Sequence, residues 1–101
     1  MSSINLKIST DLKQARKRIE QGWTQGAFAR DKNGKETYEY DLTAVKWCAL
    51  GATRYGDSQD FLEAFLEQSH LAEFNDTDGR TQAEVLELFD IAIICAEASG
   101  E

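Results

Sequence analysis

Hydrophobic residues are most concentrated between positions 41 and 55, and their spacing there is that of a helix. Apolar side chains recur at i, i+3, i+4 and i+7, as on one face of an α-helix: Val45, Cys48, Ala49 and Ala52. Trp47 and Leu50 extend the apolar surface beyond this stripe, and a helix that is apolar on most sides is usually buried. We therefore expect a central buried helix over 41–55, with Asp41 as its N-cap and with small residues that let neighbours approach closely.

The same spacing predicts a helix near the N-terminus. Ser9 or Thr10 can cap it, it runs to about Gln21, and Gly22 is placed to end it in the left-handed conformation. The residues expected to face inward are Leu12, Ala15 and Ile19. Over 4–8, apolar and polar residues alternate, which fits either a short strand or an extended lead-in that lies on the core.

Two further helices are predicted in the C-terminal half. One begins at Asp57 or Ser58 and ends near His70, and an irregular segment over 71–74 follows it. Its core stripe consists of Phe61, Leu62, Phe65 and Leu66. After a polar turn, Thr81 and Glu84 form a capping box that starts the last helix. That helix runs to about Ala98, with an inner face of Val85, Leu88, Phe89, Ala92 and Cys95 or Ala96.

Residues 23–40 are the least helical part of the chain. Asn33 and Gly34 both tolerate positive φ, which is typical of a tight turn. This turn can join 27–31 to 35–40 as a β-hairpin, and an irregular ordered loop fits equally well. Together the patterns predict a single, mainly α domain over 1–101: a compact four-helix domain around the central buried helix (41–55), with a small β-hairpin or ordered loop at 27–40.

Charge is distributed unevenly along the chain. The net charge is −7, but residues 1–50 carry nine Lys or Arg against six Asp or Glu, and residues 51–101 carry two against twelve. Direct nucleic-acid binding needs clustered cations and is not expected. An acidic half suits either a basic protein partner or solubility alone.

Hydropathy and cysteine content favour a cytoplasmic protein without membrane association. No apolar run approaches the roughly 20 residues of a membrane span, and the N-terminus lacks the pattern of a signal peptide. Cys48 and Cys95 lie on apolar helix faces, where cysteine behaves as a small hydrophobe. A disulfide between them is therefore not expected in that compartment.

Three local patterns occur together in this chain. They are GWTQGAFARD over 22–31, WCALGA over 47–52, and Phe74-Asn75-Asp76 continuing through Gly79-Arg80-Thr81 to Glu84-Val85-Leu86. In this combination the chain resembles, over about 22–92, a domain-of-unknown-function family of small bacterial and phage-encoded proteins. The resemblance supports the fold and implies no particular activity.

Two apparent chemical motifs are weak. Cys48 with His70 could form a nucleophile and its base, but Cys48 lies in the most apolar helix, where burial keeps a thiol protonated and inert. The turn at 75–79 is similar to a calcium loop, but aligning Gly79 with the required glycine places Phe74 and Val85 at ligand positions. We therefore predict no catalytic residue, metal site or cofactor from these motifs.

A polar loop cluster is the candidate for ligand binding or catalysis. Its members are Trp23, Arg30, Asp31, Asn75, Asp76 and Arg80. The polar members lie in segments predicted to be non-helical, where functional residues concentrate, and Trp23 and Trp47 could wall a pocket beside them. The favoured alternative is that ion pairs, Arg30–Asp76 or Asp31–Arg80, only tie the loops to the helices.

An acidic surface with an apolar centre is the candidate for partner binding. Its members are Asp60, Glu63, Glu67, Glu87, Asp90, Ile91, Ile94 and Glu97. Apolar residues ringed by acids are typical of an interface, and few cations are available to neutralise these acids. The surface suits a basic partner or a homodimer through Ile91 and Ile94, unless residues 4–8 cover the isoleucines.

We favour a small acidic non-enzymatic protein-interaction domain. Its expected partner is a basic protein that handles nucleic acid, and its expected setting is a phage or mobile element, where it would serve for example as an inhibitor. The alternative is a small-ligand-binding or catalytic domain that uses the polar loop cluster.

Overall fold

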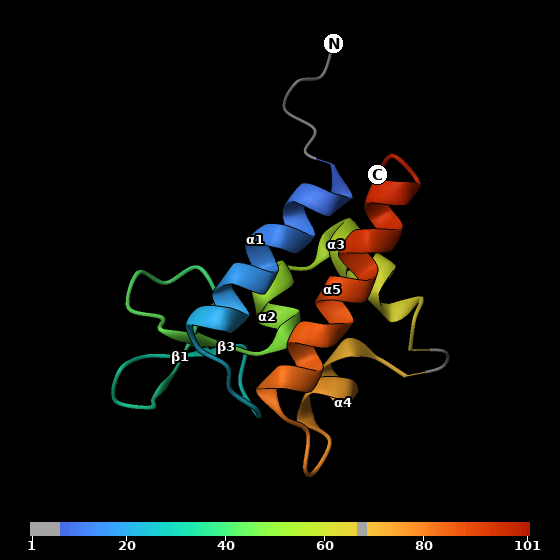
Figure 1. Ribbon diagram of the computed structural model, residues 1–101. Coiled ribbons are helices and arrows are strands. Elements are labelled where there is room, and N and C mark those ends of the chain that lie inside the picture. The colour runs from blue at the N-terminus through green and yellow to red at the C-terminus, as the bar shows by residue number, and fades with distance from the viewer. Residues whose placement is uncertain (1–6, 67–68) are drawn as a thin grey trace.

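The computed structural model describes residues 7–66 and 69–101, and Figure 1 shows two long helices side by side with a small sheet near the end of the first. The elements are α1 (Ile8–Gln21), β1 (Ala29–Arg30), β2 (Glu36–Thr37), β3 (Lys46–Trp47), α2 (Ala49–Thr53), α3 (Gly56–Glu63), α4 (Leu71–Asp76) and α5 (Gln82–Ala98). Five helices and a three-stranded sheet within these ranges make the fold mixed, where a mainly α domain of four helices was predicted.

The core lies between α1 and α5, which run antiparallel. Lys13 pairs with Glu97, and Arg16, one turn further along α1, pairs with Asp90. Seven fully buried side chains come from the two helices: Leu12, Ala15, Ile19, Val85, Phe89, Ala92 and Ala96. The inward faces predicted for the first and last helices are therefore confirmed.

One end of this helix pair carries two predicted features, of which one is confirmed and one is wrong. At the start of α5, Thr81 N–H donates to Glu84 Oε1 at 2.9 Å and Glu84 N–H donates to Thr81 Oγ1 at 3.2 Å, so the capping box is present. At the end of α1, Gly22 is extended, with φ −177°, and is not left-handed. A Cβ at Gly22 would lie 2.3 Å from Val45 O, so glycine is needed there for close approach of the chain before β3.

The predicted central helix is wrong in extent, because α2 covers only Ala49–Thr53. Asp41 caps a turn instead, and its Oδ1 accepts from Thr43 N–H at 2.8 Å. Trp47 N–H donates to Gly22 O at 3.0 Å, and Trp47 O accepts from Thr24 N–H at 3.1 Å. These tertiary bonds hold the backbone extended in spite of the helical spacing. Close approach is confirmed at Gly51, where a Cβ would lie 2.2 Å from Phe28 O.

Of the two alternatives for 27–40, a hairpin or an ordered loop, the hairpin is present. A third strand, which the helical spacing of 41–55 did not predict, pairs with it. The strand β1 pairs antiparallel with both β2 and β3, in the order β2-β1-β3. Gly34 has φ 82°, as the tight turn requires. The turn is closed by Asp31 Oδ1, which accepts from Asn33 N–H at 2.9 Å and Lys35 N–H at 3.0 Å.

The segment between α3 and α5 also differs from the prediction. Helix α3 ends at Glu63, well before His70, and the segment predicted to be irregular forms helix α4. Glu63 explains why α4 begins at Leu71, because Glu63 Oε2 accepts from Leu71 N–H at 2.7 Å. His70 N–H donates to Glu73 Oε1 at 3.1 Å and completes the cap. Glu63 is therefore a half-buried helix cap as well as a member of the predicted acidic surface.

Two further findings concern the cysteines and the length of the helices. Cys48 and Cys95 are free, as expected. Among the helices within 7–66 and 69–101, none is long and apolar enough to cross a bilayer.

Candidate functional site

Asn75 joins three parts of the fold through four side-chain hydrogen bonds. It is fully buried at the end of α4. Its Oδ1 accepts from Trp23 Nε1 at 2.7 Å and from Ala49 N–H at 2.8 Å. Its Nδ2 donates to Thr24 O at 3.1 Å and to Asp76 Oδ1 at 2.9 Å. These bonds use the two acceptor and two donor positions of the amide. We call this set of residues the Asn75 junction, and it leaves Asn75 no capacity for a ligand.

The other members of the polar loop cluster are also engaged within the protein. Arg30 donates to Thr24 Oγ1 at 2.8 Å and to the carbonyl oxygens of Gln25 and Gly34 at 3.1 and 3.0 Å. Arg80 donates to Phe74 O at 2.8 Å and lies over the Phe74 ring, 3.9 Å from its centroid.

The cluster is divided between three places in the fold. Trp23 lies in the loop after α1, and Arg30, Asn75 and Asp76 bond to that loop from β1 and α4. Asp31 instead closes the hairpin turn, and Arg80 lies against Phe74. Neither of the predicted ion pairs, Arg30–Asp76 and Asp31–Arg80, forms within 7–66 and 69–101. The loops are tied to the helices by hydrogen bonds instead.

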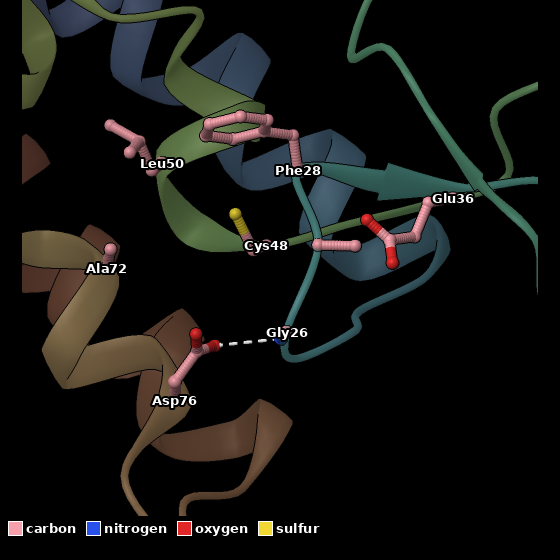
Figure 2. Close-up of a pocket in the computed structure, with 8 residues that line it drawn as sticks. Gly26, Phe28, Glu36, Cys48, Leu50, Ala72 and Asp76 are labelled. Atoms are coloured by element: carbon pink, nitrogen blue, oxygen red, sulfur yellow. Dashed lines mark hydrogen bonds between the residues drawn. The ribbon is translucent and has the colours of Figure 1, made fainter.

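A concave surface lies directly beside the Asn75 junction. We call it the acidic hollow; it has a volume of about 250 Å³ and is lined by Gly26, Ala27, Phe28, Glu36, Cys48, Leu50, Ala72 and Asp76. Figure 2 shows the carboxylates of Glu36 and Asp76 approaching it from different sides, with the Phe28 ring and Leu50 forming an apolar wall. None of these lining residues is basic. The hollow therefore combines negative charge with an apolar surface.

Its two carboxylates keep binding capacity. Asp76 Oδ1 accepts from Gly26 N–H at 3.0 Å, the bond drawn in Figure 2, and from Asn75 Nδ2. Asp76 Oδ2 accepts no hydrogen bond from the described part of the chain. Glu36 is exposed on the edge strand β2 and forms no ion pair with any described residue.

Phe28, the aromatic wall of the hollow, is supported by a strained residue. Tyr55 contacts its ring edge to face, with centroids 5.9 Å apart. The backbone of Tyr55 has φ 69° and ψ −159°, a conformation that costs non-glycine residues about 1–3 kcal/mol. Burial, followed by the charge of Glu39, raises the pKa of Tyr55 to about 12, so the phenol is neutral at physiological pH.

Cys48 lines the hollow as a protonated thiol. Burial raises the pKa of Cys48, and hydrogen bonds from the backbone only partly oppose that effect. Its Sγ accepts from Gly51 N–H at 3.2 Å and caps α2. His70 lies instead at the start of α4, where its Nδ1 is 4.0 Å from Glu63 Oε2. In the described ranges, no three His, Cys, Asp or Glu residues are grouped so that they could hold a metal ion.

A second concave surface adjoins the first across Phe28 and Glu36. This hairpin hollow has a volume of about 400 Å³ and is lined by Phe28, Glu36, Thr37, Tyr38 and Asp41. The pKa of Asp41 is lowered by hydrogen bonds from the backbone and then the hydroxyl of Thr43, so Asp41 is ionised at neutral pH. The two hollows together present three carboxylates.

The outer face of α5 carries the apolar centre of the other predicted surface. Ile91 and Ile94 are 47% and 66% exposed. Residues 4–8 were the segment expected as an alternative cover for these isoleucines. Residues 4–6 lie outside the described residues, and Ile8 begins α1.

The acids around these isoleucines are of two kinds. Asp90 and Glu97 pair with Arg16 and Lys13 of α1, so two of the few cations available do neutralise members of this surface. The hydrogen bond with Asp90 raises the pKa of Arg16. Two exposed acids, Asp60 and Glu87, form no ion pair with the described residues. Glu67 lies outside the described part of the chain.

Sequence reasoning missed Phe28, Glu36 and Leu50 as possible site residues. The Asn33–Gly34 turn carried part of the signal, because a hairpin about it pairs Arg30 with Glu36. Asp76 reaches the same hollow only through the tertiary contacts of α4 with the loop after α1. No local pattern in the sequence predicts that contact.

Comparison with protein families places the chain in a class without an assigned activity. It belongs to the family of unknown function DUF6197, whose family model matches residues 4–94. Neither the curated proteins nor the solved structures contain a match to the chain. Membership of a family of unknown function, as the sequence patterns predicted, is confirmed.

Proposed function

We propose that this protein is a small acidic, non-enzymatic interaction domain that binds a basic protein. In its most specific form, the partner handles nucleic acid, and the setting is a phage or mobile element. The supporting observation is the contrast between engaged arginines and available acids. Each arginine has a partner within the protein, whereas carboxylates border both hollows and exposed acids lie on α3 and α5.

The contacts of the arginines explain this contrast. Arg16 pairs with Asp90, Arg18 donates to Ala52 O at 2.7 Å, and Arg54 lies 5.6 Å from the centroid of the Tyr40 ring. Arg30 and Arg80 donate to the contacts described above. A hydrogen bond to a neutral acceptor leaves the charge of a guanidinium unchanged, but it uses N–H donors that could otherwise bind a partner. Exposed acids attract basic surfaces over about 8 Å at physiological ionic strength.

The states of the Cys48 thiol and the Asn75 amide favour binding over catalysis. Catalysis would need a base or nucleophile with a tuned pKa in a cleft. The pKa of the Cys48 thiol is raised, and the Asn75 amide is saturated with hydrogen bonds. These observations favour recognition by shape and charge.

The test is the association of the protein with a fluorescent dodecapeptide of alternating Arg and Gly, measured by stopped flow at low and physiological salt. Asp60→Asn with Glu87→Gln removes two exposed acids and leaves the Glu63 cap intact. Gln14→Lys with Gln21→Lys is the matched control, because it changes net charge equally on exposed positions of α1.

We expect the acid-removing pair to slow association at least twice as much as the control pair, and salt to reduce the difference. Equal slowing by both pairs would show that only net charge matters. That result, or a parent protein that does not bind the peptide at either salt concentration, would overturn the proposal.

A further inference from the structure

We infer that the acidic hollow receives a single guanidinium group, presented by an arginine side chain of the basic partner. This inference rests on the proposed function and specifies the group that the domain recognises. It is carried by three features of the hollow: its size, the position of its carboxylates and its aromatic wall.

The size of the hollow suits one side chain. Its volume of about 250 Å³ lies below the roughly 300–1,000 Å³ typical of small-molecule pockets. A protein partner that inserts one anchoring residue into a concave site needs no larger space, and arginine is among the residues enriched at such anchor positions.

The charged side chains that line the hollow are both acidic and favour a cation. Glu36 and Asp76 approach it from different sides, and no lining residue is basic. Asp76 is held in place through Oδ1 by Gly26 and Asn75, and its Oδ2 stays available. A planar guanidinium has five N–H donors and can bond two carboxylates at once.

Phe28 favours arginine over lysine. A cation within about 6 Å of an aromatic centroid is attracted by the ring, and a guanidinium can also stack on it, which the compact and strongly hydrated ammonium group of lysine cannot do. The Phe28 ring is 45% exposed and forms part of the wall of the hollow. Leu50 extends the apolar surface beside it, as Figure 2 shows.

The surrounding structure holds these groups in place before a ligand arrives. The Asn75 junction fixes Asp76, the close contact of Gly51 with Phe28 O fixes the residue before β1, and Tyr55 supports the Phe28 ring. A site that needs little reorganisation loses less free energy on binding. The hairpin hollow, with Tyr38 and Asp41, adjoins this site and is open to the residues that flank the arginine.

The experiment is a titration of the ¹⁵N-labelled protein with three nine-residue Gly/Ser peptides that differ only in their central residue: arginine, lysine or citrulline. Citrulline has nearly the shape of arginine but no charge. The amide of Gly26 is the reporter, because it donates to Asp76. Glu36→Gln removes one carboxylate of the hollow, and Asp60→Asn is the matched control outside it.

We expect the arginine peptide to shift the Gly26 amide and to bind at least about fivefold more tightly than the citrulline peptide, with lysine between them. Glu36→Gln should weaken arginine binding about threefold to fivefold, and Asp60→Asn by less than twofold. Equal binding of the arginine and citrulline peptides, or equal effects of the two variants, would overturn the inference.

The same titration separates this inference from the proposed function. If the Arg/Gly dodecapeptide binds as proposed while the Gly26 amide does not respond to the arginine peptide, the acidic hollow is not the receptor and the proposed function stands. If neither peptide binds, both fail.

Discussion

Asn75 and Asp76 are consecutive residues at the end of α4, yet the structure uses them in opposite ways. Asn75 is fully buried and all four of its hydrogen-bonding positions are engaged. Asp76 is exposed, uses Oδ1 within the protein, and keeps Oδ2 at the edge of the acidic hollow. One residue stabilises the fold, and the other is available for binding.

This difference gives a physical criterion for sorting polar residues that lie close together. Removing one partner from a buried hydrogen-bond network leaves the other groups unpaired at about 1–3 kcal/mol each. Changing an exposed carboxylate usually alters stability by less than about 1 kcal/mol. Polarity and loop position alone do not separate the two kinds of residue, whereas unused hydrogen-bonding capacity does.

The largest expected effect on stability comes from the packing of Trp47. It is the value with which the effect of changing the Asn75 junction is compared. Trp47 is nearly buried in β3, and its Nε1 donates to Glu39 O at 3.0 Å. Trp47→Ala should lower the free energy of unfolding by about 3–5 kcal/mol, because the ring contacts are lost and a cavity remains. Urea denaturation measures this, and an unchanged midpoint would contradict the packing described for β3.

Asn75→Ala should have the next largest effect. It leaves Trp23 Nε1–H and Ala49 N–H without their acceptor, so we expect a loss of about 2–4 kcal/mol. Asp76→Asn, a change at the exposed neighbouring residue, serves as the matched comparison in the same urea experiment. A loss below about 1 kcal/mol for the alanine variant would show that the junction does not stabilise the fold.

A smaller effect is expected at alkaline pH from Tyr55, the residue that supports Phe28. Its pKa is raised from 10.0 to about 12 in the folded protein. The unfolded chain therefore loses the proton first, so stability is unaffected below about pH 10 and falls as the pH rises from about 10 to 12. Urea midpoints measured across this range should fall less for Tyr55→Phe than for the parent, and identical slopes would contradict the assignment.

Helices whose signals lie within their own sequence could be predicted. The stripe of α1 and the capping box of α5 need only residues within a few turns of each other, and both are confirmed. The 41–55 segment could not be predicted in this way, because Trp47 bonds to Gly22 and Thr24, more than twenty positions away. Helix α4 was missed for a related reason: its N-terminus is capped by Glu63 from the preceding helix.

The candidate site could be predicted only in part. Polarity singled out Trp23, Arg30, Asn75 and Asp76, and the structure brings these residues together at the loop after α1. Their roles depend on burial, which a sequence does not contain. Phe28 and Glu36 line the hollow only because the hairpin folds beside α2 and α4, so no motif indicated them.

The most direct test of the distinction between Asn75 and Asp76 is a paired measurement on Asp76→Asn. The variant keeps an Oδ1 acceptor for Gly26, so its free energy of unfolding should lie within about 1 kcal/mol of the parent. Its affinity for the arginine-centred peptide should fall about threefold to fivefold, with citrulline binding unchanged. A variant that is as unstable as Asn75→Ala yet binds arginine like the parent would contradict the account, because Asp76 would then be a structural residue like its neighbour.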